Sequence, residues 1–141
     1  MKIFLDANIL VTVLCNEYPQ FTFCSRILSL CDYKEFEIYT SPLCLAIAFY
    51  FTEKKNGKNV ARKKINILAR KIRITMMNDE TVKKTIANKS VKDFEDGLEY
   101  YSAVQSKCKC IVTNDKNDFY FSEIETLNAH DFILKYLVTK K

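Results

Sequence analysis

Two short apolar runs, each ended by polar residues, constrain the fold of this chain more than any other feature. The first is Ile3-Phe4-Leu5, which Asp6 follows, and the second is Cys110-Ile111-Val112, which leads into Thr113-Asn114-Asp115. Apolar runs of this length are typical of buried strands in a parallel sheet. Functional groups of open α/β sheets collect at the carboxyl edge of the strands. We therefore expect Asp6 and Asp115 to meet at that edge.

Strand patterns and helix patterns alternate along the 141 residues. The expected strands span 2–6, 36–40, 73–77, 110–113 and a weaker 124–127. The first two expected helices span 8–17 and a segment that begins at Pro19 and includes 23–31. The others span 43–53, 60–72, about 79–87, a segment that begins at Ser90 and a segment that follows Asn128. Alternation of this kind predicts a single α/β domain over 1–141, a three-layer α/β/α sandwich whose central parallel sheet has four to five strands flanked by helices.

Composition excludes several classes of protein. Hydrophobic residues make up 48% of the chain and charged residues 28%, which is ordinary for a globular domain. No apolar run approaches the roughly 20 residues of a membrane span, and the N-terminus lacks the pattern of a signal segment. We therefore expect a cytoplasmic protein with no membrane partner.

The six cysteines favour neither disulfides nor a zinc site. No CxxC pair occurs, four of the six lie within apolar helical patterns, and the chain has one histidine. We interpret them as buried, reduced side chains that act as small hydrophobes. The cysteines are Cys15, Cys24, Cys31, Cys44, Cys108 and Cys110.

The net charge of +5 is unevenly distributed, because lysines and arginines crowd the segment between Lys54 and Arg73. A basic region beside a carboxylate cluster suits a polyanionic substrate. The alternative is a solvated face of the helix expected over 60–72.

Further acidic residues accompany the two strand ends. Asp93 and Asp96 open the helix expected from Ser90, where Ser90 and Asp93 have capping-box spacing, and Asp118 lies in a turn after Asp115. Crowded, buried carboxylates repel one another, and a divalent cation such as magnesium or manganese removes that penalty. Such an ion can activate water for attack on a phosphodiester. Taken singly, each acid also has a structural explanation as a helix-start or turn residue.

Three segments resemble the PIN-domain nucleases, especially the small bacterial branch of VapC-like toxins. FLDANIL at 4–10 is similar to the family's LDTNVLL, KDFEDGL at 92–98 to DFEDAL, and IVTNDKNDF at 111–119 to ITRDxxDF. The resemblance covers essentially the whole chain and implies a PIN fold with a magnesium- or manganese-dependent ribonuclease centre.

The resemblance also implies roles for individual residues. Asp6, Asp96 and Asp115 match the family's catalytic, metal-binding acids, Asp118 matches a further metal-binding acid, and Asn8, Thr113 and Asp93 are supporting residues. The family's basic surface usually meets RNA, many members are homodimers, and many are silenced by a small antitoxin protein. We therefore expect an RNA substrate, an antitoxin and a homodimer.

One position departs from the family pattern. The family usually carries a glutamate in a segment like SPLTLAE, whereas this chain has SPLCLAI at 41–47, with Ile47 at the glutamate position. Glu53 lies too far along the helix to replace it. The alternative function is therefore a catalytically weakened PIN-like domain that binds RNA or a protein. A receiver-like phosphoacceptor domain is a lesser alternative. That fold would be expected to carry an adjacent pair of acidic residues near the first strand, and Asp6 has no acidic neighbour.

Overall fold

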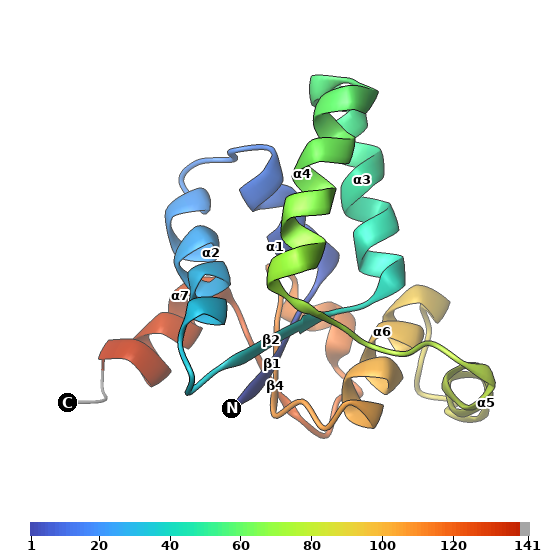
Figure 1. The fold of residues 1–141 in the computed structure, drawn as a ribbon. Helices are drawn as coiled ribbons and strands as arrows, with labels where there is room; N and C mark the ends of the chain where they lie inside the picture. The colour runs from blue at the N-terminus through green and yellow to red at the C-terminus, as the bar shows by residue number, and fades with distance from the viewer. Residues whose placement is uncertain (139–141) are drawn as a thin grey trace.

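A five-stranded parallel sheet forms the centre of the molecule (Figure 1). The computed structural model describes residues 1–138. The strand order is β3-β2-β1-β4-β5, and all four pairings are parallel. The strands are β1 (Lys2–Leu5), β2 (Glu37–Thr40), β3 (Arg73–Ile74), β4 (Cys110–Val112) and β5 (Glu125–Leu127). The predicted parallel sheet is therefore confirmed.

The two apolar runs of the sequence occupy the middle of this sheet. Ile3, Phe4 and Leu5 are fully buried, as is the whole of Cys110–Val112. Both faces of these strands are covered, which is why their sequences do not alternate between apolar and polar residues. The edge strand β3 is shorter than the predicted 73–77, and both of its residues are exposed.

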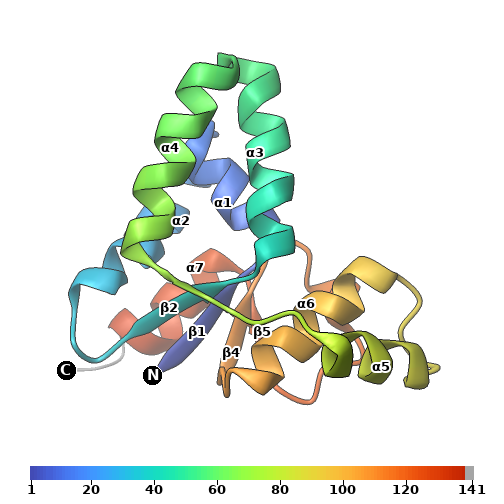
Figure 2. The same ribbon diagram turned by 45° about the vertical axis from the view of Figure 1, so that its right-hand side comes forward.

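Helices cover the sheet on both sides, so the predicted three-layer arrangement is confirmed (Figure 2). Helices α2 and α7 lie together on one side, and α5 and α6 lie together on the other. Helices α3 and α4 run side by side as a hairpin that extends away from the sheet. The α-helices are α1 (Ala7–Leu14), α2 (Phe21–Leu28), α3 (Pro42–Asn56), α4 (Lys58–Lys71), α5 (Asp79–Ala87), α6 (Phe94–Gln105) and α7 (Ala129–Ile133). The short 3-10 helices η1 (Ser29–Asp32) and η2 (Lys116–Phe119) and the π-helix η3 (Leu134–Val138) complete the described elements. No helix within residues 1–138 is both long and apolar enough to cross a bilayer.

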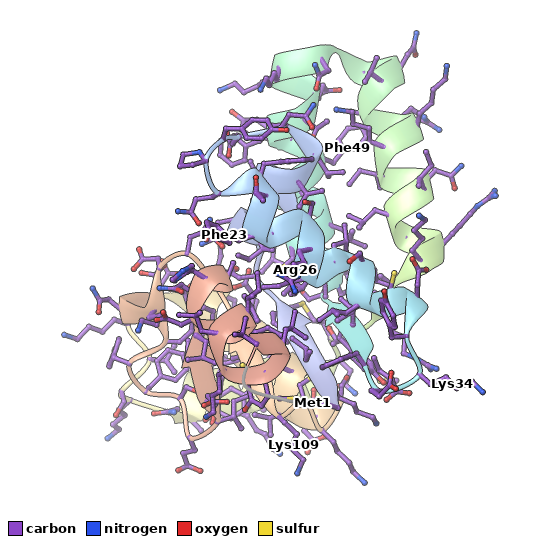
Figure 3. All side chains as sticks on the ribbon, turned by 90° about the vertical axis from the view of Figure 1, so that its left-hand side faces the viewer. Met1, Phe23, Arg26, Lys34, Phe49 and Lys109 are labelled. Carbon is purple, nitrogen blue, oxygen red and sulfur yellow. The ribbon has the colours of Figure 1, made fainter. Side chains whose placement is uncertain are left out.

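The amino ends and the carboxyl ends of the strands lie toward opposite ends of the molecule. Met1 and Lys109, which precede β1 and β4, lie at the end of the molecule opposite Phe49 of the hairpin (Figure 3). Asp6 and Thr113, which follow the same two strands, therefore lie at the carboxyl edge. The register pairs Leu5 with Val112, so the two polar residues that follow are neighbours.

Helix α6 begins later than the sequence predicted. The start at Ser90 was wrong, because the segment before Phe94 is a turn in which Asn88 Oδ1 accepts a hydrogen bond from the Ser90 amide. Asp93 is the N-cap instead, and its Oδ1 accepts the amide hydrogens of Glu95 and Asp96 at 2.9 and 3.4 Å. Asp96 is consequently in the first turn of α6.

The glycine inside α6 marks a close approach of two helices. A Cβ atom at Gly97 would lie 2.5 Å from Thr85 Cγ2 of α5 and 2.7 Å from Val91 Cγ1. No side chain fits in that space. Gly97 therefore holds the first turn of α6 tightly against α5, which fixes the position of the neighbouring Asp96.

Helix α3, apolar around most of its circumference, packs between α1 and α4 and also contacts α6. Cys44, Ala48 and Thr52 are fully buried, whereas Tyr50 and Phe51 are about half exposed. Ser41 caps the helix through a 3.0 Å hydrogen bond that its Oγ accepts from the Cys44 amide, as the Ser-Pro pair predicts.

Candidate active site

Asp6 is a buried carboxylate at the carboxyl edge of the sheet. It follows β1 with extended backbone angles and caps α1, so its Oδ1 accepts the Ala7 amide at 2.7 Å. Its Oδ2 accepts a 2.8 Å hydrogen bond from the hydroxyl of Thr113. The residue is only 6% exposed. Both oxygens of this buried carboxylate are therefore oriented by neighbouring donors.

Asn8 and Thr113 link the loops that follow β1 and β4. The Asn8 side-chain amide donates to Thr113 Oγ1 at 3.1 Å, and its Oδ1 accepts the Asn114 amide at the same distance. Thr113 Oγ1 also accepts the backbone amide of Asp115 at 3.1 Å. The threonine hydroxyl thus joins Asp6, Asn8 and the chain leading to Asp115 in one network.

Thr113→Val is expected to lower the free energy of unfolding by about 1–3 kcal/mol, because it leaves buried partners of the lost hydroxyl unsatisfied. Chemical denaturation measures the change. Thr126→Val on β5, where the hydroxyl makes one 3.4 Å contact, is the matched control and should change stability by less than about 0.5 kcal/mol. Equal stability of Thr113→Val and the wild type would contradict the network's role.

A cavity of about 410 Å³ opens beside Asp6. Six acidic residues line it, and none of the described lining residues is lysine, arginine or histidine. The remaining walls include Asn8 and Ile47. The acidic lining residues are Asp6, Glu17, Glu95, Asp96, Glu99 and Asp118. Acidic side chains are therefore concentrated here, and none of the described lining residues is a cation that would balance them.

The crowding perturbs the carboxyl groups. Burial, followed by the charges of Asp93, Asp118 and Asp6, raises the pKa of Asp96 to about 7. Burial and the charges of Asp115 and Asp6 raise the pKa of Asp118 above its usual value. Neighbouring negative charges thus contribute to the raised pKa values of both groups.

The predicted site residues do not all lie at equal depth. Asp6, Asp96 and Asp118 share the cavity, whereas Asp115 is exposed and is not among its lining residues. Asp115 contacts the site through its neighbours, since its carbonyl accepts the Asp118 amide at 3.2 Å. Asp93 serves as the α6 cap.

Two side chains that the sequence analysis did not assign to the site lie beside Asp6, namely Glu99, which lines the cavity, and Cys44 behind it. Glu99 of α6 is 2% exposed, and its Oε1 accepts a 3.1 Å hydrogen bond from the thiol of Cys44 on α3. One ligand atom each of Asp6, Cys44 and Glu99 lies within 4.8 Å of the other two. Burial and the charge of Asp6 raise the pKa of Glu99 to about 10. The available signal was the spacing of Asp96 and Glu99, which places both on one helix face.

Comparison with known proteins decides the family. A family model for the PIN domain matches residues 2–117. The chain belongs to the PIN-domain family.

Several known proteins resemble this PIN domain over most of their length. Ribonuclease VapC1 from Aquifex aeolicus (strain VF5) is 28% identical over 138 residues, which cover 93% of this chain and 92% of that protein. VapBC-1 from nontypeable Haemophilus influenzae gives a TM-score of 0.71 at 13% identity, covering 92% of this chain and 99% of that one. VapC20 of Mycobacterium tuberculosis, described as a Sarcin-Ricin loop cleaving toxin, gives 0.68 at 13% identity, covering 87% and 97%. The two structures share the fold.

The basic region of this PIN domain lies on the α3–α4 hairpin and has two parts. Lys55 Nζ donates to the carbonyl of Cys15, and Lys64 Nζ donates to the carbonyl of Leu14 at 2.5 Å. These two lysines satisfy carbonyls at the C-terminal end of α1 and join that helix to the hairpin. The exposed remainder on the hairpin includes Lys54, Lys58, Arg62, Lys63, Arg70 and Lys71.

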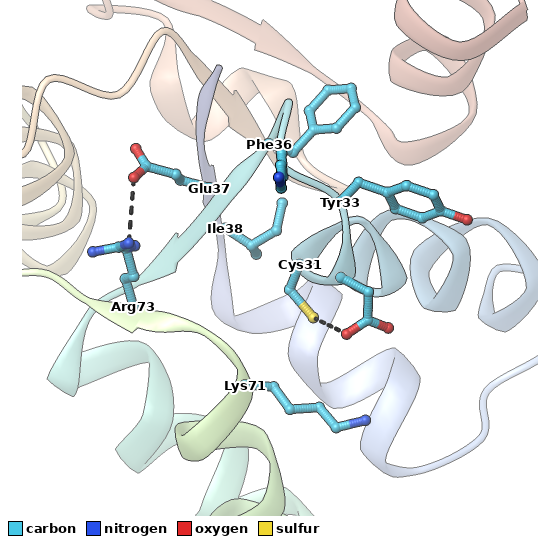
Figure 4. Close-up of a pocket in the computed structure, with 9 residues that line it drawn as sticks. Cys31, Tyr33, Phe36, Glu37, Ile38, Lys71 and Arg73 are labelled. Carbon is cyan, nitrogen blue, oxygen red and sulfur yellow. Dashed lines mark hydrogen bonds and ion pairs between the residues drawn. The ribbon is translucent and has the colours of Figure 1, made fainter.

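A second cavity, of about 390 Å³, lies at the opposite edge of the sheet (Figure 4). Phe36 and Ile38 of the β2 region line it, and Glu37 pairs with Arg73 at 3.4 Å beside it. It contains none of the predicted site residues. The acidic cavity at the carboxyl edge is therefore the candidate active site of the PIN domain.

Proposed function

We propose that this PIN domain is a metal-dependent endoribonuclease that hydrolyses RNA phosphodiester bonds, as a toxin or an RNA-processing enzyme. The observation that carries the proposal is the cavity beside Asp6, which six acidic residues line without a described basic residue. Membership of the family and the similarity to a protein named Ribonuclease VapC1 support the same reading.

The donor set of the cavity fits a divalent cation. It is dominated by carboxylate oxygens, which magnesium and manganese prefer. One of these oxygens, Glu99 Oε2, is buried and has no hydrogen-bond partner among the described residues. In the proposal Asp6, Asp96 and Asp115 hold the ion, with Asp118 as a further acid. When bound, magnesium or manganese supplies an activated water and neutralises charge on the phosphate.

The chain's own residues prepare the site for that chemistry. Thr113 and Asn8 fix the orientation of the Asp6 carboxylate through the hydrogen bonds described above. Asp93 holds the first turn of α6, which carries Asp96. The exposed lysines and arginines of the hairpin supply positive charge for an RNA backbone.

The proposal extends to partners. We propose a small antitoxin protein and a second copy of the chain as partners, in a cytoplasmic setting. The half-exposed Tyr50 and Phe51 on α3 offer apolar surface of the kind that protein interfaces cover. Structural similarity to VapBC-1 supports the antitoxin part of this proposal.

Cleavage of single-stranded RNA tests the enzymatic proposal directly. We expect the purified wild-type chain to cut RNA in manganese or magnesium and to lose that activity in excess EDTA. Gel analysis of end-labelled RNA measures both. Cleavage that persists in EDTA after repeated dialysis would contradict metal dependence.

Ile47 favours a second candidate function, a PIN-like module that binds RNA or protein without cutting. This isoleucine lines the acidic cavity where the family pattern has a glutamate. RNA binding by the wild type without cleavage, together with activity gained by Ile47→Glu, would favour this candidate. Robust cleavage by the wild type would exclude it.

A further inference from the structure

The glutamate of the family pattern is missing from α3, but a different glutamate, on α6, lines the same cavity. Ile47 lies one turn after Cys44 on the same face of α3, and both side chains are directed toward the acidic residues of α6. A glutamate at position 47 would therefore reach the same cavity. Across from this face, α6 presents a glutamate of its own, Glu99.

Glu99 occupies an unusual environment for a structural glutamate. It is 2% exposed, forms no described salt bridge, and lies beside Asp6, another buried acid. Its Oε1 accepts the Cys44 thiol, but its Oε2 has no hydrogen-bond partner among residues 1–138. Burying an unpartnered carboxylate is costly, so the oxygen requires a proton or a cation.

The grouping of potential ligand atoms around Glu99 suits a cation. Ligand atoms of Glu99, Asp6 and Cys44 lie within 4.8 Å of one another, a spacing that one ion can bridge. Asp96 lies three residues earlier on the same face of α6 and lines the same cavity. Glu99 therefore lies beside Asp6 and Asp96, two of the acids to which the proposed function assigns the ion.

We propose that Glu99 replaces the acid absent at Ile47 and is a metal ligand of this PIN domain. The carboxylate is moved from α3 to the facing position on α6, and the Cys44 thiol acts as a positioning residue that orients it. This inference depends on the proposed function, because it names a further ligand of the same ion. It also removes the reason for treating Ile47 as a sign of lost catalysis.

Manganese affinity, measured by isothermal titration calorimetry on the full chain, tests the inference without relying on activity. We expect Glu99→Gln to weaken binding by at least about 10-fold, because it removes a charged ligand while keeping the side-chain shape and the acceptor for Cys44. The matched control is Glu123→Gln, which removes the same charge from an exposed residue outside the cavity. We expect the control to change affinity by less than about 3-fold, since exposed charges interact weakly.

Two further variants strengthen the test. In the double variant Ile47→Glu with Glu99→Gln, a carboxylate returns to the α3 side, and affinity should recover to within about 3-fold of the wild type. Cys44→Ala should weaken manganese binding by roughly 10-fold, whereas Cys44→Ser, which keeps a donor, should retain most of it. Circular dichroism confirms folding, and Glu99→Asp, which shortens the side chain, replaces Glu99→Gln if that variant does not fold.

The outcomes separate the two proposals. If the wild type binds no manganese, the proposed function fails and this inference fails with it. If the wild type binds and Glu99→Gln binds equally well, Glu99 is a protonated structural acid, and only this inference is overturned. Weakening in Glu99→Gln with recovery in the double variant supports both.

Discussion

Asp6→Asn is expected to lower the rate of RNA cleavage by at least about 100-fold while leaving the fold intact. The asparagine keeps the Oδ1 that accepts the Ala7 amide, and asparagine is as good an N-cap as aspartate. The Thr113 hydroxyl already accepts hydrogen bonds from Asn8 and Asp115, so it cannot also accept one from the new amide group. We expect the loss of this single hydrogen bond to lower the free energy of unfolding by about 1–3 kcal/mol, which the thermal melts register. What disappears is the negative charge of the most deeply buried predicted ligand, which is the property that a cation requires.

The comparison needs a control with the same chemical change. Asp79→Asn removes a charge from an exposed aspartate that pairs with Lys83 on α5, and it should cut RNA at the wild-type rate. Both variants are assayed on end-labelled RNA in manganese, with thermal melts to show that they fold. Wild-type activity in Asp6→Asn would remove the enzymatic claim for this cavity.

Much of the fold can be predicted from the sequence because the central strands are buried on both faces. Fully apolar runs such as 3–5 and 110–112 are typical only of covered strands, and their parallel register brings Asp6 beside Thr113. Caps are equally local signals, and the side chains of Ser41, Asn78 and Asn128 each accept a backbone amide hydrogen in the first turn of the helix that follows. The start of α6 was misplaced because Ser90 has a capping-box spacing, while the structure uses Asp93.

The candidate site was less accessible to sequence reasoning. Asp6, Asn8 and Thr113 meet because they follow adjacent strands, a relation that the pattern of runs predicts. Glu99 was missed because a single glutamate in a helix usually faces solvent. Its side chain is buried here because α3 packs against α6. Cys44 was read as a small hydrophobe, since sequence does not reveal that its thiol has an acceptor. The cluster of these two residues is a product of tertiary structure.

Without metal, the protein is expected to lose stability as the pH rises from about 5 to about 8. In the folded chain the pKa of Glu99 is raised from 4.5 to about 10 and that of Asp96 from 3.8 to about 7, chiefly by burial. Between the ordinary and the raised pKa values the folded state binds more protons than the unfolded state. For each additional proton that the folded state binds, the free energy of unfolding falls by at most about 1.4 kcal/mol for every unit by which the pH rises. The stabilising protons are present at low pH and are lost as the pH rises.

Thermal melts in EDTA at about pH 5, 6.5 and 8 measure this effect, and we expect the Tm to fall by on the order of 10 °C across the range. The range stops below the ordinary thiol pKa of 9.0, so buried cysteines such as Cys108 contribute little. Glu99→Gln should flatten the profile, because the amide does not titrate, whereas Glu123→Gln, at an exposed residue outside the cavity, should leave it unchanged. Manganese should reverse the fall, since a bound cation favours the deprotonated carboxylates that high pH produces. A Tm that is constant or rises with pH in EDTA would show that the acids of the cavity are not held as the structure describes.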